Sequence, residues 1–372
     1  MRQISVAQPS LLGNEFKYVK DCLDTNWISS NGKYIELFEK KFADFCNTKY
    51  AVATNNGTTS LHLSLVALNL QLGDEVLIPT VTYIATANTV TYCGAKPILV
   101  DVCPRTLNIL PGEIEKKITS KTKGIIAVHL YGHPADMDEI QKIAKKYNLW
   151  VLEDAAEAHG AEVNGRKVGG IGNCGSFSFF GNKIITTGEG GIVTTNDYDL
   201  YEKLKLFRGQ GMDPKRRYWF PVIGYNYRMT NIQAAIGLAQ LEEIDKILKK
   251  REELAKFYNE ELENLKDYIT IPEKFSWAKK VHWMYNIFLK DGGELQRDNL
   301  IKYLSSKGIE TRPIFYPMHV LPPYIEKKSF PNADLVTYRG ISLPTHLGVS
   351  SEDVKYIVNM LSTFFESFKK TA

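Results

Sequence analysis

Lys183 is the residue best placed to do chemistry, because it lies in a loop just after a run of aromatic side chains in GSFSFFGNKIITTGEGGIVTTND (residues 175–197). The pattern predicts two strands, over 176–180 and 192–195, joined through this loop and a glycine-rich turn. A lysine partly withdrawn from water presents a nucleophilic amine for Schiff-base chemistry, and Ser178 can turn its hydroxyl toward the same pocket. Most lysines are solvated surface residues, so this interpretation depends on finding the rest of a site.

A candidate anion cradle lies upstream, in the run NNGTTS at residues 55–60. The run separates a predicted strand (50–54) from a predicted helix (58–70). Free N–H groups and the helix dipole at such a helix start favour a phosphate, and Gly57 allows the backbone to approach it closely. An ordinary strand-to-helix turn with an N-cap needs the same residue types, so the run alone does not identify a binding site.

A carboxylate follows the apolar run at residues 150–153, where Asp154 ends a predicted buried strand. Such a carboxylate is costly unless it is paired, and a protonated pyridine nitrogen would pair it. The alternative is an N-cap for the next helix. Glu157 and His159 follow closely. His159 is equally compatible with a substrate contact and with a place in the core.

Tyr83 lies after the predicted strand at residues 75–79 and could stack flat on an aromatic ring, although a core position is the alternative. The chain therefore offers an amine, an anion cradle, a carboxylate and a flat aromatic group. These are the four things that a protein must supply to hold pyridoxal phosphate (PLP).

Two stretches carry a resemblance to a known family: SFSFFGNKIITTGEGG around Lys183 and EDAAEAHGA from residue 153. The chain resembles the DegT/DnrJ/EryC1/StrS sugar aminotransferases over about residues 27–346. The resemblance implies the aspartate-aminotransferase-like fold (fold type I), with PLP as cofactor and pyridoxamine phosphate as its intermediate form. It implies these contacts to the cofactor: phosphate on Gly57, Thr58 and Ser178, the pyridine nitrogen on Asp154 and not Glu153, the ring against Tyr83, and the ring hydroxyl near Glu157.

The resemblance also implies a reaction. Lys183 would be the catalytic residue that carries PLP, and L-glutamate would donate the amino group to C4 of a nucleotide-linked 4-keto-6-deoxy sugar. The runs RRYW, GYNYRMTN and ETRP favour GDP-4-keto-6-deoxymannose. A UDP- or dTDP-linked sugar and a non-catalytic PLP-binding regulator are the alternatives. Family members that dehydrate their substrate carry histidine in place of this lysine, so aminotransfer is favoured.

Substrate contacts are predicted in polar, aromatic and basic runs, each of which could instead be ordinary solvated surface. The family resemblance also implies that Asn226 reaches the phosphate of a second subunit, which predicts a homodimer with two shared active sites. The predicted substrate contacts are Trp27 and Ser29 near the N-terminus, His159, Arg217 and Tyr218 in a basic aromatic loop, and Arg312, Tyr316 and His319 near the C-terminus.

Short apolar strands alternate with helices from about residue 50, which predicts an α/β domain with a mainly parallel sheet covered on both faces. Ligands of such sheets bind at the carboxyl ends of the strands. Thr230 and Gln233 form a capping box that opens one long helix, predicted over 230–265. We expect a large PLP-binding α/β domain over 1–240 and a small α+β domain over 241–372, bridged by that helix.

Composition narrows the class of protein. The chain has 372 residues and a net charge of +4, which is too small to argue for nucleic-acid binding but suits an anionic substrate. We expect no membrane partner, since no apolar run approaches the roughly 20 residues of a membrane span. The N-terminus lacks the apolar core of a signal peptide. Five cysteines without CxxC spacing predict reduced thiols in a cytoplasmic protein and no metal site.

Overall fold

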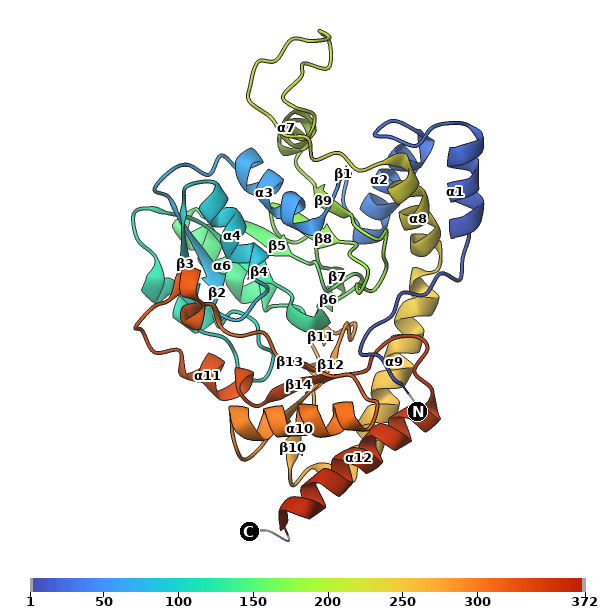
Figure 1. Cartoon of the computed structure of the whole chain (residues 1–372). Helices are drawn as coiled ribbons and strands as arrows, with labels where there is room; N and C mark the ends of the chain where they lie inside the picture. Colours follow the sequence, from blue (N-terminus) through green and yellow to red (C-terminus); the bar gives the residue numbers. More distant parts are fainter. Residues whose placement is uncertain (1–2, 370–372) are drawn as a thin grey trace.

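A computed structural model describes residues 3–369, and the side chains as far as residue 367. Its centre is a seven-stranded sheet in the order β1-β9-β8-β5-β4-β2-β3 (Figure 1). The strands are β1 (Tyr50–Thr54), β2 (Glu75–Pro79), β3 (Lys96–Val100), β4 (Thr122–Val128), β5 (Trp150–Asp154), β8 (Cys174–Ser178) and β9 (Gly191–Thr195). Strand β9 is antiparallel to both of its neighbours, and β8, β5, β4, β2 and β3 pair in parallel. The predicted α/β class with a mostly parallel sheet is confirmed.

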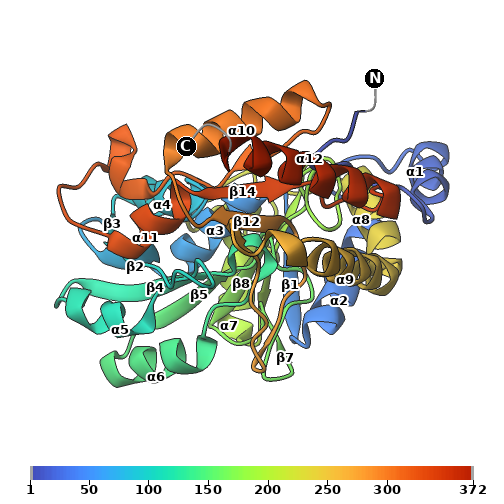
Figure 2. The same cartoon turned by 90° about the horizontal axis from the view of Figure 1, so that it is seen from below.

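The central strands are almost wholly buried because helices cover both faces of the sheet. Figure 2 shows α3 and α4 on one side and α5 and α6 on the other. Two of the short strands, β6 and β7, form a separate small sheet with β11. The elements are α1 (Glu15–Asp24), α2 (Lys33–Cys46), α3 (Gly57–Ala67), α4 (Ala85–Tyr92), α5 (Pro111–Ile114), α6 (Met137–Tyr147), α7 (Tyr198–Arg208), β6 (Glu162–Val163), β7 (Arg166–Lys167) and β11 (Ala278–Lys279).

The C-terminal part builds a four-stranded antiparallel sheet in the order β10-β12-β14-β13. It has its own apolar core, which includes Tyr258, Leu300 and Leu361, and Ile4 from the N-terminus joins that core. The division into domains at residue 240 remains a prediction. The elements are β10 (Ile269–Thr270), β12 (Tyr285–Leu289), β13 (Arg312–Pro313), β14 (Gly340–Leu343), α10 (Glu294–Ser306), α11 (Pro331–Thr337) and α12 (Ser351–Lys369).

The predicted single helix over 230–265 is wrong in its continuity. The capping box of Thr230 and Gln233 is present, but the helix is divided into α8 (Asn231–Glu242) and α9 (Ile244–Glu261). The backbone leaves helical geometry at Glu243, with φ −100° and ψ 2°. This change of direction lets α8 pack on α1 and α2 while α9 runs down to the second core (Figure 1).

An extended arm, residues 209–229, joins α7 to α8 and projects from the top of the molecule in Figure 1. Its tip exposes large apolar and aromatic side chains: Tyr218, Trp219, Phe220 and Ile223, the last 90% exposed. Elsewhere, no helix within residues 3–369 combines the length and the apolar character that crossing a membrane requires.

Candidate active site

A cavity of about 660 Å³ opens at the carboxyl ends of the parallel strands and extends to the C-terminal sheet. Its wall comes from β5 and β8, from the start of α3, and from β13 and β14. The cavity is therefore where an open α/β sheet is expected to bind its ligand. The predicted residues that line it are Gly57, Thr58, Tyr83, Asp154, Glu157, Ser178, Lys183 and Arg312.

The side chain of Lys183 is 12% exposed and lies between a ring and a carboxylate. Its Nζ lies 4.2 Å from the centroid of the Trp283 ring and 3.6 Å from Oε1 of Glu157. Its backbone N–H donates to the carbonyl of Phe180 at 2.9 Å, which closes the turn that presents the lysine. The amine is thus held inside the cavity wall and not in solvent, as the aromatic run predicted.

Glu157 faces Lys183 from a buried position. Its Oε2 accepts the backbone N–H of Tyr131 at 2.8 Å, and Tyr131 adopts a left-handed backbone with φ 53°. Burial raises the pKa of the Glu157 carboxyl to about 7, while the nearby charge of Lys183 opposes that shift. Near neutral pH this carboxyl can therefore hold or release a proton beside the lysine.

Asp154 ends β5 and is buried at the cavity wall. Its carboxylate accepts the Thr86 hydroxyl at 2.7 Å and the backbone N–H of Ala156 at 3.3 Å. Burial raises the pKa of the Asp154 carboxyl, and these two donors only partly offset it. A cation delivered into the cavity would stabilise the ionised form.

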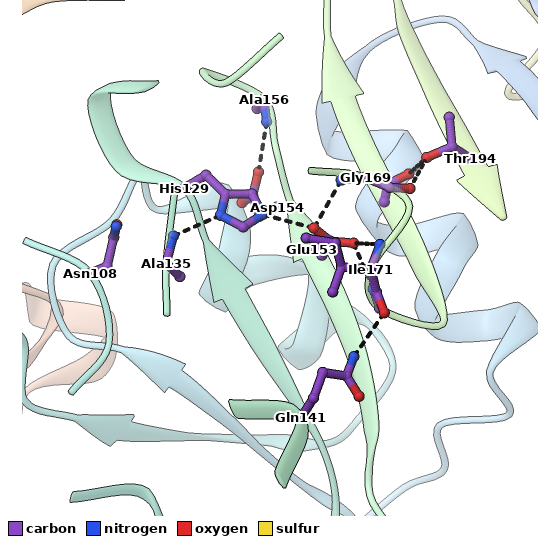
Figure 3. A network of polar contacts seen from close by, with 12 residues as sticks. Asn108, His129, Ala135, Gln141, Glu153, Asp154, Ala156, Gly169, Ile171 and Thr194 are labelled. Carbon is purple, nitrogen blue, oxygen red and sulfur yellow. Dashed lines mark hydrogen bonds and ion pairs between the residues drawn. The ribbon is translucent and has the colours of Figure 1, made fainter. Parts of the chain in front are cut away.

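Glu153 is buried in a separate polar network that Figure 3 displays beside Asp154. Its oxygens accept backbone N–H groups of Gly169, Ile171 and Gly172 at 2.7–2.8 Å and lie 3.0 Å from Nε2 of His129. Successive side chains of a strand point to opposite faces, so only one of the two carboxylates reaches the cavity. Glu153 anchors the 169–172 loop and Asp154 is the one left for a ligand.

The hydrogen bonds of its two ring nitrogens fix the tautomer of His129. Nδ1 accepts the backbone N–H of Ala135 at 3.0 Å, so it carries no proton, and Nε2 must donate to Glu153. The histidine is therefore neutral and acts as a fourth hydrogen-bond donor to the buried Glu153 carboxylate (Figure 3).

The start of α3 forms the predicted anion cradle. Asn56 caps the helix by accepting the N–H of Thr59, which leaves other N–H groups of the first turn available at the cavity wall. A Cβ added at Gly57 would lie 2.6 Å from Cβ of Ser178, a contact that real side chains do not make. Only glycine therefore allows the helix start to meet the Ser178 hydroxyl at one edge of the cavity.

Two predicted substrate contacts lie elsewhere. His159 is fully buried and packs against Phe42, Phe177 and Phe179, and its ring nitrogens make no hydrogen bond among the described residues. Burial lowers its pKa to about 3, so it is neutral. It is a core residue here, so we withdraw the contact that its position in sequence suggested.

His319 is also buried, with its ring nitrogens 2.8 Å from the Thr80 hydroxyl and 3.1 Å from Oδ1 of Asp334. It connects the end of β2 to α11 and does not line the cavity. Tyr316 donates its hydroxyl to Glu294 at 2.8 Å, also outside the cavity wall. The predicted substrate contact of His319 is therefore withdrawn, and that of Tyr316 remains a prediction.

The remaining predicted residues lie outside the cavity of their own chain and at the surface. Trp27 is 57% exposed, and the backbone carbonyls of Trp27 and Ser29 accept hydrogen bonds from Asn231. Arg217, Tyr218 and Asn226 belong to the projecting arm, where Arg217 stacks over the Tyr218 ring at 5.0 Å. None of these residues lines the cavity beside Lys183 in its own chain.

The sequence interpretation missed several residues of the cavity wall. Trp283, Tyr131 and Phe315 form a stack of aromatic rings, with centroids 5.8 Å and 5.3 Å apart. They come from segments far apart in sequence, and no local pattern distinguishes them from core aromatics. The hydroxyl of Thr86, three residues past Tyr83 and in the first turn of α4, was a local signal that could have been found.

A sequence model of the DegT/DnrJ/EryC1/StrS aminotransferase family matches residues 9–362. The chain belongs to this family. It is 54% identical to the GDP-perosamine synthase of Caulobacter vibrioides, over 96% of this chain and 97% of that protein. It is 48% identical to the GDP-perosamine synthase of Escherichia coli O157:H7, over 98% and 99%, and 42% identical to that of Vibrio cholerae, over 97% and 99%.

Solved structures of sugar aminotransferases share the fold. Helicobacter pylori PseC, an aminotransferase involved in the biosynthesis of pseudoaminic acid, superimposes with a TM-score of 0.93 at 30% identity, over 98% of this chain and 100% of that one. Streptococcus pneumoniae Spr1654 in its PMP-form gives 0.94 at 26% identity, over 100% and 99%. The predicted fold type I is confirmed, and the protein is a PLP-dependent sugar aminotransferase.

The cavity of this chain fits that cofactor on its own evidence. The close approach of Gly57 to Ser178 leaves a small, N–H-rich edge for a phosphate. Asp154 offers a buried carboxylate that gains from a protonated ring nitrogen, and Lys183 offers the amine.

Glu157 predicts a pH dependence of stability. Its folded pKa, about 7, is above the ordinary value of 4.5, so its stabilising contribution is complete below pH 4.5 and is lost as the pH rises toward 7. Glu157→Gln should remove this loss. We expect denaturant midpoints of the variant to rise relative to wild type between pH 4.5 and 7, with the exposed Glu36→Gln as control. A constant difference over that range would contradict the assignment.

Gly57→Ala should weaken binding of the cofactor, because the new methyl group must push α3 away from Ser178. Loss of one charge-assisted contact to a phosphate corresponds to an affinity lower by about tenfold or more. Titration of the cofactor-free protein with PLP, followed by visible absorbance, measures this. Gly181→Ala is the matched control, since a Cβ there meets nothing within 4 Å. Equal affinities for the two variants would exclude the proposed cradle.

Proposed function

We propose that this protein transfers an amino group from L-glutamate to C4 of GDP-4-keto-6-deoxymannose and so forms GDP-perosamine. The observation that carries the proposal is the identity of 54%, 48% and 42% to three GDP-perosamine synthases over nearly the whole chain. The cavity supports it, because Lys183, Asp154 and the Gly57–Ser178 edge all meet there. Use of the product in lipopolysaccharide O-antigen and a cytoplasmic location remain predictions.

The cofactor, when bound, supplies an aldehyde that accepts an amino group and a ring that withdraws electrons from the reacting carbon. The amine of Lys183 would hold the cofactor at rest. Once released, its Nζ would take the proton from Cα of the donor and, in the second half of the reaction, return one to C4 of the sugar. Its place inside the wall, near Trp283 and Glu157, keeps this amine out of water.

Asp154 would keep the ring nitrogen protonated, which its buried carboxylate can do only by remaining ionised beside that cation. Glu157 would exchange a proton with the ring hydroxyl, as its pKa of about 7 permits. Thr58 and Ser178 would bind the phosphate with Gly57, and Tyr83, which lines the cavity and is 58% exposed, would cover the ring.

Arg312 would bind an anionic group of a substrate at the mouth of the cavity. It is 44% exposed and 3.6 Å from Glu310, and it lines the cavity from β13. Trp27, Ser29, Arg217 and Tyr218 would contact substrate only if a second subunit brought its surface to this cavity.

Two relatives support alternatives to the proposed function. One is a dTDP-3-amino-3,6-dideoxy-alpha-D-galactopyranose transaminase from Aneurinibacillus thermoaerophilus, 37% identical over 92% of this chain. It supports the same chemistry on a dTDP-linked sugar, and a UDP-linked sugar belongs to the same class. The other, from Geobacillus stearothermophilus, is called a pleiotropic regulatory protein and is 35% identical over 91% of this chain. It favours a non-catalytic regulator as the second candidate function.

A product assay distinguishes these functions. The protein with PLP and L-glutamate should convert GDP-4-keto-6-deoxymannose to an amino sugar, detected by mass spectrometry, in preference to UDP- and dTDP-4-keto-6-deoxy sugars. Lys183→Ala should abolish turnover, while the solvent-facing Lys249→Ala should not. Product only from UDP or dTDP substrates would discard the GDP assignment. A protein that binds PLP but acts on no ketosugar would favour the regulator.

We also propose a homodimer whose active sites combine residues of both subunits. The projecting arm supports this, because its exposed aromatic tip and the exposed Asn226 have no function within one chain. Large apolar side chains gathered on such a projection are typical of a subunit interface. In that arrangement Asn226 would bind the phosphate of the cofactor in the other subunit.

Mixing two inactive variants tests the shared site. Lys183→Ala and Asn226→Ala subunits, refolded together in equal amounts, should regain about a quarter of wild-type activity, since half of the dimers then hold one intact site of two. Asn196→Ala, which changes an exposed asparagine outside the arm, should behave as wild type. No recovery in a preparation that is dimeric by sedimentation would show that each subunit forms its site alone.

A further inference from the structure

Trp283 covers the amine of Lys183 in the cavity wall, and the roles described above use it only to exclude water. Its ring face lies 4.2 Å from Nζ of Lys183. Its indole N–H donates to the carbonyl of Asn182 at 2.7 Å, so it also holds the backbone next to the lysine. One side chain thus contacts both the amine and the loop that carries it.

Contacts on the other side of its ring and along its backbone hold Trp283 in place. Its ring stacks on Tyr131 with an interplanar angle of 12°, and Tyr131 donates its backbone N–H to Glu157. Two residues earlier, Val281 donates its N–H to the carbonyl of Gly132 at 3.0 Å. The segment that leads into β12 therefore lies against the large sheet's side of the cavity and presents the ring to Lys183.

Arg251 of α9 fixes the backbone of this segment. Its Nη1 donates to the carbonyls of His282 at 3.3 Å, Trp283 at 3.2 Å and Thr345 at 2.7 Å. The guanidinium is buried, and burial lowers its pKa to about 10. A buried cation is costly unless it is well hydrogen-bonded, so this arrangement is tightly constrained around the Trp283 carbonyl.

We propose that Trp283 is a positioning residue that holds the amine of Lys183 against its ring face whenever that amine is free of the cofactor, and holds it most strongly once the amine has taken up a proton. The proposal rests on the proposed role of Lys183 as the residue that moves the proton. The face of an aromatic ring carries negative charge, and tryptophan attracts a desolvated ammonium most strongly of the aromatic residues. Without this contact, the flexible side chain of Lys183 could move its amine away from the reacting carbon during each half of the reaction.

A purely structural Trp283 would fill the same space without depending on the charge of its ring. An experiment that changes the electron density of the ring but keeps the ring itself can distinguish this structural role from the proposed positioning role. Fluorine atoms on the indole withdraw electron density from the ring face, so a series of mono-, di- and trifluorotryptophans weakens the contact stepwise while the ring stays in place. All five tryptophans are replaced together. The same series in Trp283→Phe is therefore the matched control.

The first readout needs no substrate. The full chain without cofactor is treated briefly with acetic anhydride, and acetylation of Lys183 is measured by peptide mass spectrometry against that of the exposed Lys249. Holding the amine as an ammonium on the ring slows acetylation, so we expect about a threefold rise across the fluorinated series in wild type. The Trp283→Phe protein should show no such trend. Equal labelling of Lys183 across the wild-type series would overturn the proposal.

The second readout is steady-state kinetics of the PLP-loaded enzyme. We expect kcat to fall stepwise with fluorination while KM for both substrates stays constant, because Trp283 acts on the lysine and not on substrate. Trp277→Leu, which changes a half-buried tryptophan outside the cavity, should leave kcat unchanged. A stepwise fall that persists in Trp283→Phe would assign the effect to another tryptophan and overturn the proposal.

The two readouts keep this proposal separate from the proposed function. If the wild-type protein acts on no ketosugar, the function fails, while the acetylation series still decides whether Trp283 holds Lys183. If turnover is normal and acetylation is insensitive to fluorine, the function stands and Trp283 is a packing residue.

Discussion

The active site depends on how two adjacent carboxylates at the end of β5 are stabilised. Glu153 and Asp154 point to opposite faces of the sheet, and both are buried. Glu153 accepts three backbone N–H groups and the N–H of a neutral His129, so it is stable without any ligand. Among the described residues, Asp154 accepts hydrogen bonds from one hydroxyl and one backbone N–H, and burial raises its pKa because these donors compensate it only in part. The first carboxylate fixes a loop, and the second lies at the cavity wall, where the proposed contact with a protonated ring nitrogen would stabilise it.

The cavity above Asp154 is built by two sheets that supply different kinds of group. The seven-stranded sheet contributes the charged and anion-binding residues, which lie where its parallel strands end. The four-stranded sheet and its leading segment contribute Trp283 and Arg312, which close the cavity from the opposite side. Arg251 and His319 do not line the cavity, yet they attach the second set of elements to the first through buried hydrogen bonds. Displacement of one sheet relative to the other would therefore separate Lys183 from the aromatic stack that covers it.

Sequence reasoning succeeded where one short segment contains the whole signal. Gly57 sits between a strand and a helix start, Asp154 ends an apolar run, and Lys183 follows an aromatic one, so each could be recognised locally. It failed where burial decided the role. His159 and His319 look like polar site residues in sequence, but the core surrounds the first and a hydrogen-bonded contact between β2 and α11 surrounds the second. The helix predicted over 230–265 is broken at Glu243. Residues of α8 and of the start of α9 pack on the first core, while the end of α9 packs on the second, and periodicity does not report which core a face will meet.

The sequence by itself determined the fold class and, through the family resemblance, the cofactor, and it indicated the residues that we propose hold that cofactor, since strand and helix periods and the cofactor-binding turns are properties of contiguous residues. Only the tertiary structure decided which of two neighbouring carboxylates faces the cavity, and which aromatic side chain covers the lysine. Trp283 lies 100 residues from Lys183 in the chain, and the two meet because Arg251, Tyr131 and Gly132 hold Trp283 and the backbone that leads to it. Contacts between distant segments depend on how whole sheets pack, and no local pattern of residue types encodes that geometry.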